Sequence, residues 1–310
     1  MSQPFPFSVV LPRCRCVYWL ALLLLAASYL FAGSAPSSKA AAPKKWAVSV
    51  QPVRLVNGAP VVFTVSPPAR LSSLSGVWLS HDVPFSFDPT RKVWYAIAGV
   101  SLETPPGSYS LALKGTTAVG KELGFQRILS VKAAKYPSVH VSVSSKFTEP
   151  SAEQLKQISE DKAVKQDLFA RVTPEREWSG EFHAPVEARI SDIFGTRRVF
   201  NGKVQSMHQG LDYAVPAGTP IAALNRGTVL LARPLYFEGN CVVLDHGQGL
   251  LTLYLHMSEI KVKEGDQVER GQRLGLSGGT GRATGPHLHV AVRWQGVYLD
   301  PATLLKLKLP

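Results

Sequence analysis

Residues 262–292 read VKEGDQVERGQRLGLSGGTGRATGPHLHVAV and lie in the C-terminal third of the chain. It mixes short apolar runs with many glycines and ends in His287-Leu-His289. Because side chains alternate between the faces of a strand, His287 and His289 are expected to share one face. The glycines favour tight turns that swing this strand into position. The Gly-Lys-Ser/Thr ending of a phosphate-binding loop is missing, which argues against nucleotide binding.

The same pattern extends outward from this stretch. From about Gly180 onward, short strands recur with many glycines and no long helical segment, which predicts an all-β unit of roughly 130 residues. Within it, His208-Gln-Gly-Leu-Asp212 places an imidazole and a carboxylate four residues apart. On an extended strand such positions lie on the same side, so both can point at one ion. A third segment, Tyr254-Leu-His256, adds another histidine.

Together these residues have the composition of a catalytic zinc site. Such a site has three protein ligands and one open position, and His208, Asp212 and one histidine of the 287/289 pair supply the three. Zinc lowers the pKa of bound water to about 7, and the remaining histidine can accept the proton and pass it to a leaving amine. His256 can donate a hydrogen bond to the developing oxyanion. Each motif alone is more typical of a structural histidine, but their combination predicts metal-assisted amide hydrolysis.

From Ser191 to Pro301 the sequence resembles the lysostaphin-like, LytM-domain zinc metallopeptidases. Besides the opening stretch, the matching segments are SDIFGTRR (191–198), HQGLDYAVPAGTPIAAL (208–224), GNCVVLDHG (239–247), LTLYLHMS (251–258) and LDP (299–301). The resemblance implies an antiparallel β-sheet that forms a groove with one Zn²⁺ on its floor. It implies His208, Asp212 and His289 as zinc ligands, His287 as general base and His256 as second catalytic histidine.

The resemblance also implies a substrate, the stem peptides of peptidoglycan, whose cross-links or bridges the family cuts. A Gram-negative periplasm would make this the direct stem-peptide cross-link. Because some relatives have lost zinc ligands, the alternative is a catalytically silent, peptidoglycan-binding activator of a cell-wall amidase; all five positions are filled here, which favours the endopeptidase. The net charge of +12 indicates an anionic partner without identifying it. A nucleic-acid binder is disfavoured, because basic and aromatic residues do not cluster and the N-terminal sequence described below predicts export.

The N-terminus indicates export. Arg13 and Arg15 precede the apolar run VYWLALLLLAASYLFA (17–32), and small residues follow, which predicts a signal peptide or membrane anchor over residues 1–35. The protein is therefore expected in the periplasm or cell envelope, touching the membrane only through an uncleaved N-terminal segment. Cleavage would leave Cys241 as the only cysteine, in an apolar run typical of a small buried hydrophobe.

The region between leader and C-terminal unit divides into three parts. After a linker at 36–45, short apolar runs with turn residues between them predict an Ig-like β-sandwich over 46–145. Residues 146–179 are expected to form a helical connector that Ser151 caps with Gln154. The sandwich resembles, more loosely, domains that precede this peptidase in periplasmic relatives. We expect the sandwich or the connector to control access to the groove.

Other residues have alternative interpretations. Arg197, Arg198 and Arg282 are candidates to line the groove and meet substrate carboxylates, with ordinary surface arginines as the equal alternative. His246 is expected in a turn after a strand, and His183 is expected to be structural.

Overall fold

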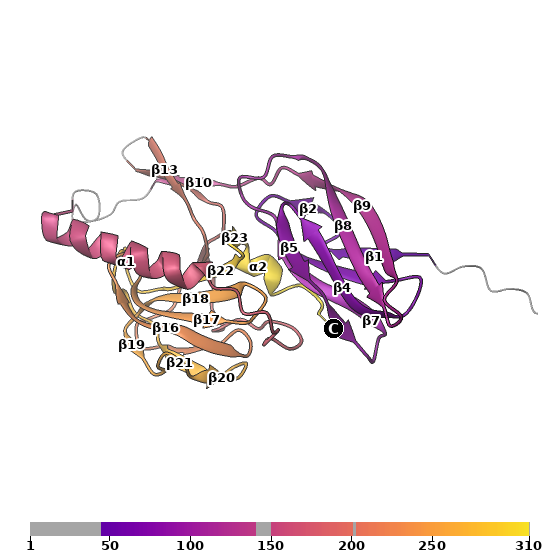
Figure 1. Cartoon of the computed structure of the whole chain (residues 1–310). Helices are drawn as coiled ribbons and strands as arrows, with labels where there is room; N and C mark the ends of the chain where they lie inside the picture. Colours follow the sequence, from indigo (N-terminus) through magenta and orange to yellow (C-terminus); the bar gives the residue numbers. More distant parts are fainter. Residues whose placement is uncertain (1–44, 141–149, 201–202, 310) are drawn as a thin grey trace, which may run out of the picture. The chain divides into compact units, whose positions relative to one another are not determined.

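The computed structural model describes residues 45–140, 150–200 and 203–309 (Figure 1). The predicted leader at 1–35 and nearly all of the linker therefore lie outside the described residues. Within the described ranges, neither helix is long and apolar enough to cross a membrane. The chain is mainly β, as the sequence predicts.

Two sheets form the N-terminal sandwich. The first has the order β1-β3-β7-β6, with β1 Ala47–Gln51, β3 Pro60–Ser66, β7 Val93–Gly99 and β6 Ser86–Asp88. The second has the order β2-β9-β8-β4-β5, with β2 Leu55–Val56, β9 Glu122–Lys132, β8 Gly107–Thr117, β4 Leu71–Trp78 and β5 His81–Pro84. Phe63 packs edge-on against Trp78 with ring centroids 5.6 Å apart, so the two inner faces bury one another. The Trp78 indole N–H donates to the carbonyl of Gly99.

Helix α1 spans Ala152–Ala170 and begins with the predicted capping box. The Ser151 hydroxyl accepts from the backbone N–H of Gln154, whose side chain accepts from the backbone of Ser151. On this helix Leu155 is 54% exposed, whereas Leu168 is buried and Val164 and Phe169 pack against the same apolar cluster. A polar contact adds to this packing: the buried Asp161 carboxylate accepts from the backbone N–H of Tyr236.

An eight-stranded antiparallel sheet forms the C-terminal part. Its order is β11-β14-β22-β18-β17-β16-β20, with β23 beside β22; the strands are β11 Ile190–Asp192, β14 Leu211–Tyr213, β22 Leu288–Trp294, β18 Leu250–Met257, β17 Gly239–Asp245, β16 Gly227–Leu235, β20 Gln267–Val268 and β23 Val297–Leu299. A second sheet has the order β15-β21-β19, with β15 Pro220–Ala222, β21 Arg273–Leu276 and β19 Glu259–Ile260. A short helix, α2 Pro301–Leu304, follows β23.

A third small sheet joins a strand from the end of the sandwich to the C-terminal part. Its order is β10-β12-β13, with β10 Ser138–His140, β12 Arg197–Phe200 and β13 Lys203–Met207. β10 runs parallel to β12, and the backbone N–H of Arg197 donates to the carbonyl of Pro137.

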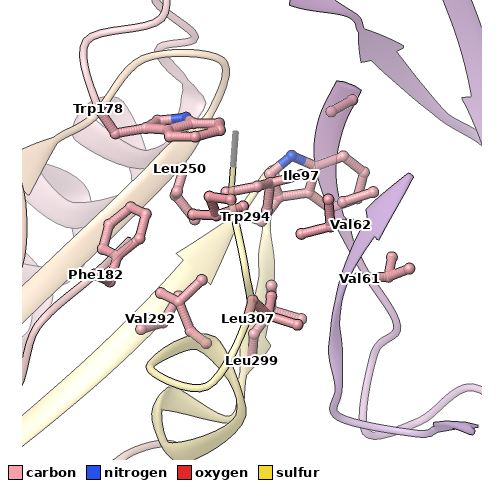
Figure 2. Close-up of a cluster of buried hydrophobic side chains, with 14 of the residues drawn as sticks. Val61, Val62, Ile97, Trp178, Phe182, Leu250, Val292, Trp294, Leu299 and Leu307 are labelled. Carbon is pink, nitrogen blue, oxygen red and sulfur yellow. The ribbon is translucent and has the colours of Figure 1, made fainter. Parts of the chain in front are cut away.

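Buried apolar side chains from both parts meet in one core cluster (Figure 2). Val62 and Ile97 come from the sandwich, whereas Trp294 and Leu299 come from β22 and β23. Gly99 makes room for Leu299, since a Cβ at Gly99 would lie 2.5 Å from that side chain. The sandwich and the C-terminal sheet thereby pack against each other at the end of β22 and at β23. Strand β22 and its neighbours also carry residues of the candidate site.

Candidate active site

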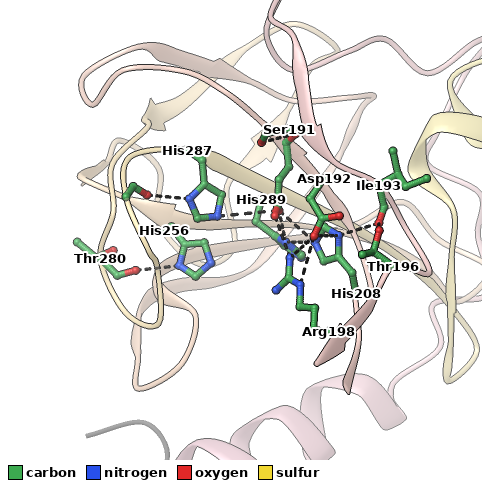
Figure 3. A network of polar contacts seen from close by, with 12 residues as sticks. Ser191, Asp192, Ile193, Thr196, Arg198, His208, His256, Thr280, His287 and His289 are labelled. Atoms are coloured by element: carbon green, nitrogen blue, oxygen red, sulfur yellow. Dashed lines mark hydrogen bonds and ion pairs between the residues drawn. The ribbon is translucent and has the colours of Figure 1, made fainter. Parts of the chain in front are cut away.

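Three polar atoms from His208, Asp212 and His289 converge at one point. Figure 3 shows the rings of His208 and His289 next to each other. The Nε2 atom of His208 lies 3.1 Å from Oδ1 of Asp212 and 3.0 Å from Nδ1 of His289. Nδ1 of His289 lies 2.7 Å from the same carboxylate oxygen. The residues that the sequence singled out as ligand candidates are therefore brought together.

The geometry that brings them together differs from the predicted one. Asp212 and His289 are direct partners across β14 and β22, but His208 lies in the loop before β14 rather than on the same strand as Asp212. Strand alternation was therefore the wrong reason for their shared direction. The close approach depends on Gly210, where a Cβ would lie 2.4 Å from Nε2 of His289 and 2.5 Å from the carbonyl oxygen of Val290.

The three atoms fit a metal ion. A tetrahedral zinc site with bonds near 2.0–2.1 Å separates its ligand atoms by about 3.3 Å, close to the spacing found here. His208 Nδ1 lies 2.9 Å from the carbonyl oxygen of Ile193, an acceptor, so this nitrogen carries the proton of the neutral ring. Nε2 of His208 then faces Oδ1 of Asp212 lone pair to lone pair. A bound cation would remove that repulsion.

The surroundings of Asp212 favour its charged form. Burial alone would raise its pKa, but the neighbouring imidazoles of His208 and His289 outweigh burial and hold the pKa below its usual range. Its second oxygen accepts from the guanidinium of Arg198 at 3.0 Å, and Arg198 also contacts Asp192 at 2.8 Å. Asp192 was not singled out from the sequence, because no spacing links it to the histidines. Its role follows from the pairing of β11 with β14.

His287 and His256 lie beside this cluster with ring centroids 4.8 Å apart. Nδ1 of His287 lies 2.9 Å from the carbonyl oxygen of Gly285, and Nδ1 of His256 lies 2.8 Å from that of Thr280. Both Nδ1 atoms must therefore donate when the rings are neutral, which leaves both Nε2 atoms as acceptors. Nε2 of His287 is 3.9 Å from Oδ1 of Asp212, so His287 and His289 share a face as predicted.

A backbone irregularity directs His256 toward the site. His256 has φ +63°, in the left-handed region, and the register between β17 and β18 shifts at this point. Such a bulge re-aims one side chain of a strand. Burial and the neighbouring His289 and His287 lower the pKa of His256 to about 3, so the ring is neutral near pH 7. A neutral His256 with Nδ1 committed to Thr280 is a proton acceptor, and it can donate to an oxyanion only after taking up a proton.

These side chains line a groove of about 340 Å³. Asp212, His256, His287 and His289 form part of its lining, and His208 lies beneath them, 2% exposed. A larger cavity, about 730 Å³, opens beside β4, β5 and β8 but contains none of these histidines.

Comparison with known proteins identifies the family. Residues 206–301 match peptidase family M23. A crystal structure from Pseudomonas aeruginosa described as a peptidase M23 is 31% identical, with a TM-score of 0.63, and covers 81% of this chain and 95% of that chain. The chain belongs to peptidase family M23. The fold and the family resemblance expected from the sequence are thus confirmed.

Curated relatives resemble this M23 chain over its C-terminal part. The peptidoglycan DD-endopeptidase ShyA of Vibrio cholerae is 44% identical over 129 residues, which are 41% of this chain and 29% of that protein. The DD-carboxypeptidase/endopeptidase Mpg of Neisseria meningitidis is 39% identical over 119 residues, which are 38% of this chain and 27% of that protein. The match thus spans less than a third of the length of either relative.

The two other histidines of the C-terminal part lie outside the site. His246 follows β17, as expected, and is fully buried, with its ring bonded to Arg226 and Thr252. His183 is exposed, and its backbone N–H donates to the carbonyl of Leu224. Cys241 is buried in β17, as predicted for a small hydrophobe.

Proposed function

We propose that this protein is a zinc metalloendopeptidase that hydrolyses peptide cross-links of bacterial peptidoglycan. The proposal rests on one observation: His208, Asp212 and His289 converge beneath a groove that also contains His256 and His287. The M23 match and the names of the Vibrio and Neisseria relatives support the reaction and the substrate class.

In this proposal His208, Asp212 and His289 hold one zinc ion. When bound, zinc supplies Lewis-acid chemistry that polarises the scissile carbonyl and acidifies water. The chain's own contribution is to orient the ligand atoms: Arg198 fixes the carboxylate of Asp212, and the Ile193 carbonyl fixes the tautomer of His208.

His287 and His256 move the protons. With Nδ1 bonded to a carbonyl oxygen, Nε2 of His287 is free to accept a proton from the attacking water as general base. The protonated ring then donates to the leaving amine. His256 is held in the same way, and it is the second histidine proposed to assist the transition state.

We also propose the location and the division of the chain. Residues 1–35 would direct the protein to the periplasm or cell envelope, as a cleaved signal or as a membrane anchor. Residues 46–145 would form the sandwich domain, 146–179 the connector and 180–310 the peptidase domain. The pairing of β10 with β12 means that the end of the first domain also contributes a strand beside the groove.

The decisive experiment is mass spectrometry of muropeptides after purified protein has been incubated with peptidoglycan sacculi, with and without a chelator. We expect zinc-dependent loss of cross-linked dimers, abolished in His208→Ala and retained in His183→Ala, a change at an exposed histidine away from the groove. Dimers that persist with zinc bound would overturn the proposal. The favoured hypothesis would then be the catalytically silent activator of a cell-wall amidase. That hypothesis predicts that the His287→Ala variant still stimulates the amidase.

A further inference from the structure

The structure separates the three arginines that the sequence placed near the groove. Arg197 is exposed on β12 and does not line the groove. Arg198 lines the groove, but its guanidinium is paired with both Asp192 and Asp212. Arg282 lines the groove, and no carboxylate within the described residues forms an ion pair with it. Among the three, Arg282 is therefore the cation available to a ligand.

The backbone around Arg282 is firmly held. Its N–H donates to the carbonyl of Phe237 at 2.8 Å, and its guanidinium lies over the Phe237 ring, 4.7 Å from the centroid. The preceding Gly281 has φ +72°, and a Cβ there would lie 2.3 Å from the backbone nitrogen of Gly239. The position of the guanidinium is thus set by a stacked ring and a tight turn rather than by a counter-ion.

The electrostatic setting favours an anion. Partial desolvation and the positive charge of Arg198 lower the pKa of Arg282, and Glu238 offsets only part of this effect. Glu238 is itself paired with Lys165 at 2.5 Å. A guanidinium remains charged under such conditions and binds carboxylates through two parallel N–H···O bonds.

The loop that carries Arg282 also supports the two histidines proposed to move protons. Thr280 accepts from His256 through its carbonyl, Gly285 accepts from His287, and Arg282 lies between them in sequence. Of the two, His287 would deliver the proton to the leaving amine. Arg282 therefore lies on the side of the groove that the leaving amine and its substituents would occupy.

We propose that Arg282 is a substrate-carboxylate subsite: its guanidinium binds a free carboxylate borne on the carbon that is attached to the scissile amide nitrogen. This inference rests on the proposed function and deepens it. It selects peptides with an acidic group at that carbon, as in a direct cross-link between two stem peptides or in a C-terminal amino acid, over bridges that lack it.

The test compares two substrates, a cross-linked muropeptide dimer and the same dimer with this carboxylate converted to an amide. The zinc-loaded wild-type protein should prefer the acid by about 10- to 100-fold in kcat/KM, the range expected for a charge-assisted hydrogen bond. In Arg282→Gln, kcat/KM for the acid dimer should fall by that factor, whereas kcat/KM for the amide dimer should stay the same. Arg282→Lys should retain part of the preference for the acid dimer. Arg233→Gln, a change at an exposed arginine on β16 outside the groove, should keep the full preference.

A second readout does not depend on turnover. Calorimetry with chelator-treated protein measures the binding of the amine product that carries the free carboxylate and of the same product with this carboxylate converted to an amide. Only the product with the free carboxylate should bind more weakly to Arg282→Gln than to the wild type. The proposed subsite would be wrong if the wild type bound and cut the acid and the amide equally well, or if Arg282→Gln lost the same factor on both. If neither dimer is cut although the acid binds preferentially through Arg282, the subsite stands and the proposed endopeptidase function fails.

Discussion

Lowering the pH from about 7.5 to about 5 should destabilise the metal-free protein by about 2 kcal/mol through His246 alone. This histidine is fully buried, and burial lowers its pKa to about 4 from the ordinary 6.5. The unfolded chain therefore takes up the proton first as the solution is acidified.

Burial explains why the ring of His246 stays neutral. Nδ1 of His246 lies 2.7 Å from the carbonyl oxygen of Arg226 and donates to it, and Nε2 lies 2.8 Å from the Thr252 hydroxyl, which donates to Tyr254. A second proton would place a positive charge in a fully buried site, and burial disfavours the charged form more than the contacts with Arg226 and Asp245 favour it.

The size of the effect follows from the two pKa values. The pKa of His246 is lower in the folded protein than in the unfolded chain. The contribution of His246 to the free energy of unfolding is therefore complete above pH 6.5 and is lost as the pH falls toward 4. At pH 5 the unfolded histidine is almost fully protonated and the folded one is mostly neutral. One and a half pH units at about 1.4 kcal/mol each give about 2 kcal/mol.

Urea unfolding followed by tryptophan fluorescence, with chelator present, measures the effect in the wild type and in His246→Gln. Glutamine can donate to the Arg226 carbonyl but does not titrate. Since all other titrating groups are common to both proteins, the difference between their unfolding free energies should shrink by about 2 kcal/mol from pH 7.5 to pH 5. Parallel dependence of the two proteins on pH would refute the reasoning.

Three further outcomes are expected. Gly210→Ala should push the His289 ring out of place and lower activity by about 100-fold or more, the scale of a 1 Å misplacement, with zinc content measured alongside; normal kinetics would contradict the close approach. Asp212→Asn should remove the charged ligand and leave the purified protein with far less than one zinc per chain by metal analysis. Cys241, buried with a raised pKa, should resist thiol reagents until the protein is unfolded, so rapid labelling of the native protein would count against its burial.

Local patterns in the sequence were sufficient where local physics decides the structure. Short apolar runs form strands of the predicted sandwich, such as β7, and the capping box at Ser151 forms as predicted. The pairing of His287 with His289 on one face follows from strand periodicity alone. These features depend on residues that are close in sequence, so one amino-acid sequence is enough to predict them.

Other features depend on tertiary contacts that no local pattern shows. Asp212 meets His208 because Gly210 lets the loop approach β22, and His256 turns inward because a bulge gives it a positive φ. Helix α1 could be located from its capping box, but two of the contacts that attach it could not be predicted: Asp161 accepts from the backbone of Tyr236 and Lys165 pairs with Glu238, both far away in sequence.

The fastening of the sandwich to the C-terminal part has a consequence for biosynthesis. The Gln51 side chain donates to the carbonyl of Lys308, 257 residues away, and the backbone N–H of Asp300 donates to the carbonyl of Gly58. Leu299 fills the space left by Gly99. Contacts between such distant residues form late. The apolar face around Ile97 therefore stays exposed to solvent while the ribosome is still adding the later strands. We expect a chaperone that binds unfolded chains to bind this face during synthesis.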